Sequence, residues 1–255
     1  MASAATPNSR HSTKADGVLL ARKAVRRVPK RRRAPSLAIR YMFYAAFLLA
    51  IILTALFVYL YRINYLSLSI AGAGSSIFLS LIFPFAAFAY LIRKGNSPKS
   101  MIAGLGLKKK GLTKRNIFLG MMLFLAIFLT EVLLNVFQEL THISLPTNVQ
   151  TLFAGLPLYF LVFAAFVAPF NEEIFFRGLL VSRLGIVLSA LFFSLLHYLN
   201  YQASISEFIA AFIFGLLAGY VFKRTKSLYP SITAHILVNS LAAIALIWPG
   251  MLIIT

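Results

Sequence analysis

YMFYAAFLLAIILTALFVYLY, residues 41–61, carries no charged side chain over a length that crosses the hydrocarbon core of a bilayer. Such a run predicts a transmembrane helix, because in lipid a helix satisfies all of its backbone polar groups within its own segment. The whole chain has a matching composition, since 60% of its residues are hydrophobic and only 12% are charged. We therefore predict an integral membrane protein of the all-α class.

Seven apolar runs, the first of them within residues 41–61, predict a polytopic bundle of about seven membrane helices. They occupy residues 42–61, 67–92, 117–138, 152–171, 184–199, 205–222 and 231–249. The fifth and sixth runs are short and adjoin polar residues, so we expect helices buried in the bundle rather than facing lipid. The sixth contains Gly215-x-x-x-Gly219, a small-residue pattern that favours close packing within the bundle, with a dimer face as the alternative.

The distribution of basic residues predicts the orientation in the membrane. Every Lys and Arg except Arg62 lies in one of four segments, residues 1–40, 93–116, 172–183 and 223–230. Alternating spans place these segments on the same side, which is the cytoplasmic side by the positive-inside rule. We expect a multi-pass protein of the bacterial plasma membrane with its N-terminus inside. Topology accounts for the net charge of +19, so we expect no nucleic-acid partner.

The chain divides into three expected parts. Residues 1–40 are a disordered basic cytoplasmic tail that would contact anionic lipid, with a plastid-type transit peptide as the alternative. Residues 41–149 hold the N-terminal membrane helices and the basic loop 93–116, and residues 150–250 form the domain that carries the chemistry. The chain has no cysteine, which excludes disulfides, thiolate catalysis and cysteine-ligated zinc.

A first polar motif, Glu172-Glu173-x-x-x-Arg177, interrupts apolar sequence, and ionisable groups at membrane depth usually mark function. Adjacent residues on a helix point about 100° apart, so we expect one carboxylate to act and the other to support it. Arg177 lies one turn beyond Glu173 and would hold it ionised, which leaves Glu172 as the candidate general base. The alternative is a structural ion pair, with the arginine extending to the cytoplasmic interface.

Two further motifs place polar groups one helical turn apart, Phe193-x-x-x-His197 and His235-x-x-x-Asn239. The His197 imidazole could orient or share a proton with a water activated by glutamate, or bind a divalent metal. His235 and Asn239 can both donate hydrogen bonds, which is what a tetrahedral oxyanion requires. Hydrogen bonding between helices is the alternative for both residues.

In this order the three motifs resemble those of the CAAX protease and bacteriocin-processing (CPBP, or Abi) family of intramembrane peptidases, over about residues 150–245. The resemblance implies hydrolysis of a peptide bond by glutamate-activated water, without a covalent intermediate. It implies that Glu172 is the general base with His197 beside it, and that Glu173 and Arg177 are supporting residues. His235 and Asn239 would be the oxyanion donors.

The motifs are compatible with several alternatives. Glu172, His197 and His235 would also make a plausible zinc site, so the expected CAAX prenyl protease 2-like enzyme is either glutamate-dependent or a metallo-endopeptidase. The expected partners are membrane lipid and a peptide or protein substrate with a membrane-proximal cleavage site. A non-catalytic scaffold or bacteriocin self-immunity protein is the second hypothesis, and a transporter is the third. The oligomeric state is not predicted.

The expected topology leaves the motifs at different depths. Glu172 and His235 would lie near cytoplasmic helix ends, whereas His197 would lie about 20 Å into the fifth helix at 1.5 Å per residue. A dipping loop or a tilted helix would bring them together, beside a water-filled cavity that opens to the cytoplasm. We assign Glu131 to helix packing, and expect Glu139, His142 and Glu207 near the outer surface without a chemical role.

Overall fold

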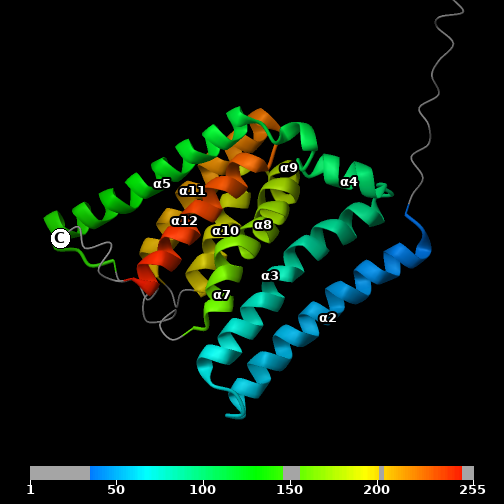
Figure 1. Ribbon diagram of the computed structural model, residues 1–255, viewed down its shortest axis with the longest axis horizontal. Helices are drawn as coiled ribbons and strands as arrows, with labels where there is room; N and C mark the ends of the chain where they lie inside the picture. The colour runs from blue at the N-terminus through cyan, green and yellow to red at the C-terminus, as the bar shows by residue number, and fades with distance from the viewer. Residues whose placement is uncertain (1–34, 146–155, 201–203, 249–255) are drawn as a thin grey trace, which may run out of the picture. The chain divides into compact units, whose positions relative to one another are not determined.

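A computed structural model describes residues 35–145, 156–200 and 204–248 of the protein, and within these ranges the chain is helical without strands. This confirms the prediction of an all-α membrane bundle. The longer elements are α2 (Leu37–Arg62), α3 (Leu68–Arg93), α5 (Lys114–Thr141), α10 (Ile186–Asn200), α11 (Ile205–Thr225) and α12 (Tyr229–Ile247) (Figure 1). Residues 1–34 lie outside the described part, and the rest of the predicted tail includes the start of α2.

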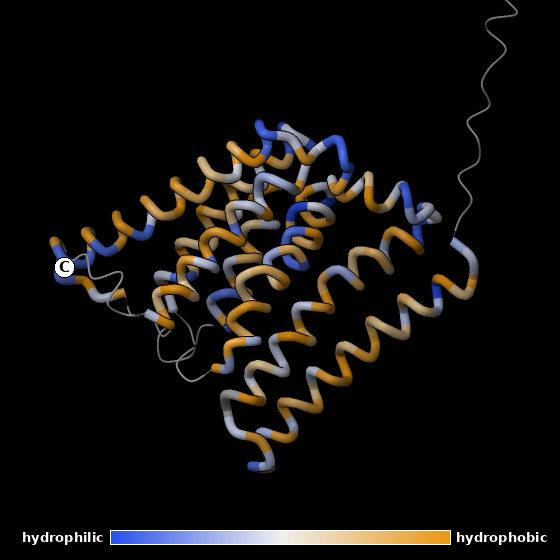
Figure 2. The backbone as a smooth tube through the Cα atoms, viewed as in Figure 1, coloured by the Kyte–Doolittle hydropathy of each residue, from blue (hydrophilic) through white to orange (hydrophobic). Residues whose placement is uncertain are grey.

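Six helices in the described part are long and apolar enough to cross a membrane, and Figure 2 shows hydrophobic residues along most of their length. The seventh expected helix, α10, has 15 residues and falls short of that length. α11 is a full-length candidate span of 21 residues, so the expectation that it is short was wrong. α10 is not wholly buried either, because Val187 and Leu199 on it are more than 60% exposed.

The fourth span is longer than its apolar run suggests, because it continues through the first polar motif to Leu184. It consists of α7 (Leu158–Val162), the π-helical turn η2 (Phe163–Val167), α8 (Ala168–Glu173), the π-helical turn η3 (Ile174–Leu180) and α9 (Val181–Leu184). The expected cytoplasmic loop 172–183 is therefore helix. The prediction from hydropathy placed the end of this span too early, because Glu173 and Arg177 are paired inside the bundle and need no water.

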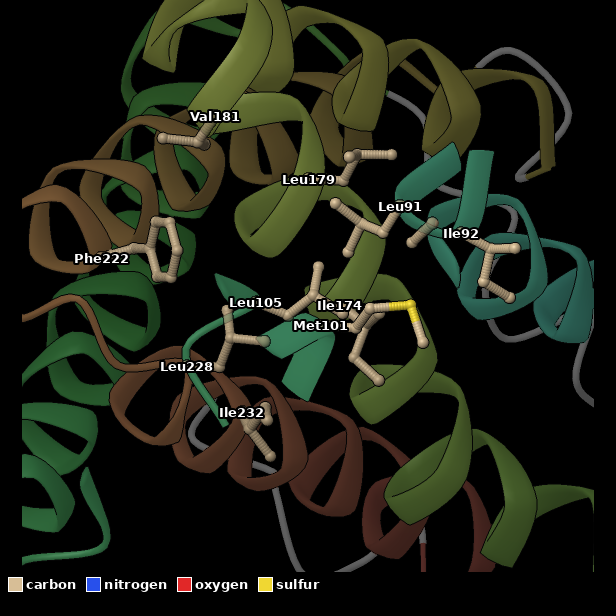
Figure 3. Packing of buried hydrophobic residues seen from close by; sticks show 11 residues of the cluster. Leu91, Ile92, Met101, Leu105, Ile174, Leu179, Val181, Phe222, Leu228 and Ile232 are labelled. Carbon is tan, nitrogen blue, oxygen red and sulfur yellow. The ribbon is translucent and has the colours of Figure 1, made fainter. Parts of the chain in front are cut away.

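The basic segment 93–116 also contains structure that the sequence did not predict. The short helix α4 (Pro98–Gly104) and the 3-10 turn η1 (Lys109–Gly111) lie within it. Met101 and Leu105 are buried and pack with Ile174 and Leu228 in a hydrophobic cluster (Figure 3). The backbone N–H of Leu228 donates to the carbonyl of Gly106 at 3.1 Å. This segment therefore covers the N-terminal end of α12.

The helices pack in pairs around the fourth span. α2 packs on α3, α10 on α11, and α12 on α5, while α3 and α12 both contact α8 (Figure 1). One buried polar contact fixes the α3 side, since Asn171 Nδ2 donates to Ser80 Oγ at 3.1 Å. The fourth span therefore lies between α3 and α12, and its polar residues are positioned from both sides.

The Gly215-x-x-x-Gly219 pattern lies at the contact between α10 and α11, as packing within the bundle requires. A Cβ added at Gly215 would lie 2.8 Å from Ala190 Cα, which is backbone and cannot move away easily. We expect Gly215→Ala to separate the two helices and destabilise the protein by about 1–3 kcal/mol. Thermal unfolding in detergent measures this effect. Gly72→Ala on α3 is the control, because nothing lies within 4 Å of its added Cβ, and an equal loss in both variants would contradict the prediction.

Candidate functional site

The turn at Gly185 brings the first two motifs to the same depth. Gly185 adopts φ +88°, which side-chain-bearing residues rarely do, and it separates α9 from α10. Glu172 lies twelve residues before the end of α9 at Leu184, and His197 lies eleven residues after the start of α10 at Ile186. Both therefore lie about equally far from the turn, and neither a dipping loop nor a strong tilt is needed.

Glu173 is the buried centre of the polar cluster. Its side chain is fully enclosed, and its Oε1 accepts hydrogen bonds from Arg177 Nη1 at 2.8 Å and from His235 Nδ1 at 3.0 Å. The predicted contact between Glu173 and Arg177 is present. Arg177 is only 1% exposed, so it is not the interfacial arginine of the alternative interpretation. The sequence did not predict the bond between Glu173 and His235, because α12 lies far along the chain.

Two aromatic rings hold the Arg177 guanidinium. Its Cζ lies 4.1 Å from the centroid of Phe193 and 4.7 Å from that of Phe214, which is cation–π geometry. The Phe193 ring also contacts His197, with centroids 4.3 Å apart. Phe193 could have been found from its place in the second motif. Phe214 had no such signal, because it is one of many phenylalanines in apolar helices.

His235 lies between the two adjacent carboxylates. Its Nδ1 faces Glu173, and its Nε2 lies 3.9 Å from Glu172 Oε2. A carboxylate accepts hydrogen bonds, so Nδ1 carries a hydrogen in the bond to Glu173. Donation from Nε2 to a substrate therefore requires both ring nitrogens to be protonated. In that form the charges of Glu172, Glu173, Arg177 and His235 sum to zero, which is favourable for a cluster removed from water.

His197 is oriented by its own helix. Its Nδ1 lies 2.9 Å from the backbone carbonyl oxygen of Phe193. A carbonyl only accepts, so Nδ1 donates and Nε2 is the nitrogen that can take a proton or bind a metal. Glu172, His197 and His235 each offer one atom that could bind a metal, and these three atoms lie within 4.8 Å of one another. The structure thus brings together three residues from three motifs.

These three residues also fit a divalent metal by their chemistry. One carboxylate and two imidazoles are the ligand set of one class of catalytic zinc site. The Nδ1 hydrogen bonds of His197 and His235, to a carbonyl and to Glu173, are the outer contacts that usually orient metal-binding histidines. Glu172 Oε2 is buried and has no hydrogen-bond partner among the described residues.

Asn239 differs from the other motif residues. Its Nδ2 donates to the backbone carbonyl of Ala164 at 2.8 Å, so one of its two amide hydrogens is directed at η2. It also lines a cavity of about 320 Å³ beside the cluster, together with His197 and His235. The remaining lining is mostly apolar and aromatic, and includes Phe124, Phe128, Phe193 and Phe214.

Two carboxylates outside the motifs, Glu131 and Glu207, also line the cavity. Glu131 is therefore not only a packing residue. Glu207 is near the start of α11, at the opposite end from the basic residues Lys223 and Arg224. The cavity thus extends from the cluster away from the basic end of α11, and the expected opening of the site to the cytoplasm stays a prediction.

Residues 154–241 match the sequence family described as type II CAAX prenyl endopeptidase Rce1-like. The match covers this segment and not the rest of the chain. The predicted resemblance to the CPBP peptidases is thereby confirmed, and the matched segment contains all six residues of the predicted site. The family is described as one of endopeptidases, so the match supports a peptidase as the general class of enzyme.

A comparison with curated proteins gives a relative of part of the chain. The uncharacterized protein YpbD of Bacillus subtilis (strain 168) is 29% identical over 83 residues, which are 32% of this chain and 43% of that protein. The chain thus matches less than half the length of this relative. No solved structure matches the chain.

Proposed function

We propose that the protein is an intramembrane endopeptidase that hydrolyses a peptide bond with water activated by Glu172. The observation that carries this proposal is the position of Glu172. Its buried Oε2 has no hydrogen-bond partner among the described residues and lies beside His235 and within reach of His197. The neighbouring Glu173 is held through its Oε1 by Arg177 and His235, whereas its Oε2 also has no hydrogen-bond partner among the described residues. One carboxylate is thus available to a water, and the other maintains the cluster.

The chemistry needs one proton acceptor and one group that stabilises negative charge. Glu172 takes a proton from the water as the oxygen attacks the peptide carbonyl, and it later delivers that proton to the leaving amine. His197 orients the water. His235 faces the oxyanion, and the family resemblance gives Asn239 a share in this role. The oxygen that attacks the carbonyl comes from water, the C–N bond then breaks as the amine takes the proton, and the protein itself forms no covalent intermediate.

The cavity indicates the kind of substrate. Its aromatic and aliphatic lining adjoins His197 and His235, so the substrate segment next to the cleaved bond would be apolar. We propose a peptide or protein cleaved in or near the membrane. We also propose a plasma-membrane location. The concentration of Lys and Arg in segments on one side of the expected topology supports an orientation with the N-terminus in the cytoplasm.

The second form of this proposal is a metal-dependent peptidase. It is favoured because three possible ligand atoms lie close together. Glu172, His197 and His235 would hold it, and when bound it would polarise the carbonyl or activate the water. Arg177 and a protonated His235 can balance the two carboxylates without a metal ion, so we take the glutamate-dependent form first.

One experiment tests the activity and separates its two forms. We expect the protein, reconstituted in liposomes, to cleave membrane peptides of its host at defined bonds, and to retain this activity after chelation. His197→Ala should abolish cleavage. A stoichiometric metal in the wild type, absent from the His197→Ala and His235→Ala variants and required for cleavage, would establish the metal-dependent form. If no peptide is cut and His197→Ala still complements a deletion strain, the non-catalytic scaffold hypothesis replaces the proposal.

A further inference from the structure

Two basic side chains from different helices meet on one tyrosine ring. Lys94 directly follows α3, and its Nζ lies 5.9 Å from the centroid of the Tyr90 ring. Arg183 lies in α9, and its Cζ lies 5.0 Å from the same centroid. The contact of Lys94 with Tyr90 follows from helical spacing. Arg183 reaches the ring only because the fold brings α9 to the end of α3.

Hydrophobic packing holds the ends of α3 and α9 together next to this ring. Leu91 on α3 and Val181 on α9 are both buried in the hydrophobic cluster of Figure 3. The Tyr90 ring packs against the same cluster. Lys94 and Arg183 themselves are exposed. The fold therefore fixes the backbone of both residues, while their cationic groups stay accessible at the surface.

No carboxylate of the described residues forms an ion pair with either cation. The ion pairs in this part of the chain all lie in the cluster of Glu172, Glu173, Arg177 and His235. Glu173 is the described acid nearest to Arg183 along the chain, and ten residues, or about 15 Å of helix, separate the two. Two neighbouring cations repel each other, and an anion bound between them replaces this repulsion with attraction.

Both cations lie at the level expected for lipid headgroups. Lys94 follows the last residue of one candidate span, and Arg183 is next to Leu184, the last residue of another. Tyrosine is enriched at this level because its ring is apolar and its hydroxyl is polar. Basic pockets between membrane helices at this level bind phosphate-bearing headgroups. Leu184 and Val187 are exposed and apolar, so the acyl chains of a lipid would contact a suitable surface beside Arg183.

We propose that Lys94, Arg183 and Tyr90 form a binding site for the phosphate group of an anionic phospholipid. A guanidinium can donate two parallel hydrogen bonds to phosphate oxygens, and the lysine ammonium adds a second positive charge. The bound headgroup would join the end of α3 to α9, two residues before the Gly185 turn that sets the depth of the first two motifs. The lipid would thereby stabilise the fold.

The alternative is that the two cations serve only to orient the protein in the membrane. Titration of the full-length protein with lipid separates the two roles without reference to peptidase activity. In neutral detergent micelles at physiological salt, phosphatidylglycerol should raise the thermal midpoint by about 5 °C, whereas phosphatidylcholine should not.

Variants of the two cations test whether this site binds the lipid. Lys94→Gln combined with Arg183→Gln should raise the phosphatidylglycerol concentration that gives half of the shift at least about tenfold. Both side chains are exposed and form no ion pair with a described residue, so we expect the variant to fold. Its midpoint without lipid should be no lower than that of the wild type, because the substitutions remove a repulsion. Arg183→Lys keeps the charge and should give an intermediate concentration.

Lys109→Gln combined with Lys110→Gln is the matched control. It removes two exposed charges from the basic segment 93–116 that do not contact the Tyr90 ring, and it should change the half-saturating concentration by less than about twofold. An equal loss in both double variants would indicate attraction to the whole basic surface and would overturn the site. Equal stabilisation by inorganic phosphate alone would overturn a lipid as its ligand. A wild-type midpoint that does not respond to phosphatidylglycerol would leave orientation as the role of the two cations.

Discussion

Glu172→Gln is expected to reduce peptide hydrolysis by about 10²–10⁴-fold, the contribution of a positioned general base. Glutamine keeps the size of the side chain and loses the proton-accepting charge. Glu172 Oε2 makes no hydrogen bond to a described residue, so the substitution breaks no hydrogen bond at this oxygen. We therefore expect the thermal midpoint to change little while kcat falls. Initial rates in liposomes, measured beside the midpoint in detergent, check both parts.

Glu139→Gln is the matched control for this experiment. Glu139 is an exposed carboxylate near the end of α5, so the same chemical change there should leave the rate within about twofold. A Glu172→Gln variant that retains at least a tenth of wild-type turnover would rule out Glu172 as the base. In that case Glu173 would be the remaining carboxylate of the cluster, and its bonds to Arg177 and His235 would have to open for it to act.

Arg177→Met is expected to be the most destabilising single change, at about 3–5 kcal/mol, because it leaves the carboxylate of Glu173 buried without its ion-pair partner. The variant also loses the guanidinium between Phe193 and Phe214. We expect the double variant Glu173→Gln and Arg177→Met to regain part of this loss, since it removes the uncompensated charge. Denaturant titrations in mixed micelles measure the free energies of unfolding.

The exposed Arg115 at the start of α5 provides the control. Arg115→Met removes the same group outside the cluster and should change stability by less than about 1 kcal/mol. If Arg177→Met were no more destabilising than this control, the buried pair would not hold the cluster together. If the double variant were as unstable as Arg177→Met, the loss would come from the aromatic contacts and not from the charge left on Glu173.

Several features of the protein could be predicted from local sequence. Apolar runs such as residues 41–61 predicted membrane helices, because the length of a span depends on bilayer thickness and not on neighbours. The contact of Glu173 with Arg177 followed from helical spacing alone. The order of the three motifs led to the Rce1-like family, and the comparison over residues 154–241 confirmed it.

Hydropathy failed where charges are paired within the bundle. It ended the fourth span near residue 171, whereas the helix continues to Leu184 through Glu173 and Arg177. This error also produced the apparent difference in depth between Glu172 and His197. A window of residues measures the transfer of each side chain to lipid, and it does not include a partner that lies inside the protein.

The sequence by itself determined the helical class, the apolar composition that suits a membrane protein, and the residue types of the site. Only the tertiary structure decided the position of His235 between Glu172 and Glu173, the aromatic contacts of Arg177 and the bond from Asn239 to Ala164. The physical reason is the distance along the chain between the groups that interact. Helix formation and insertion depend on groups within a few turns, whereas each of these contacts joins helices whose approach is set by packing of the whole bundle.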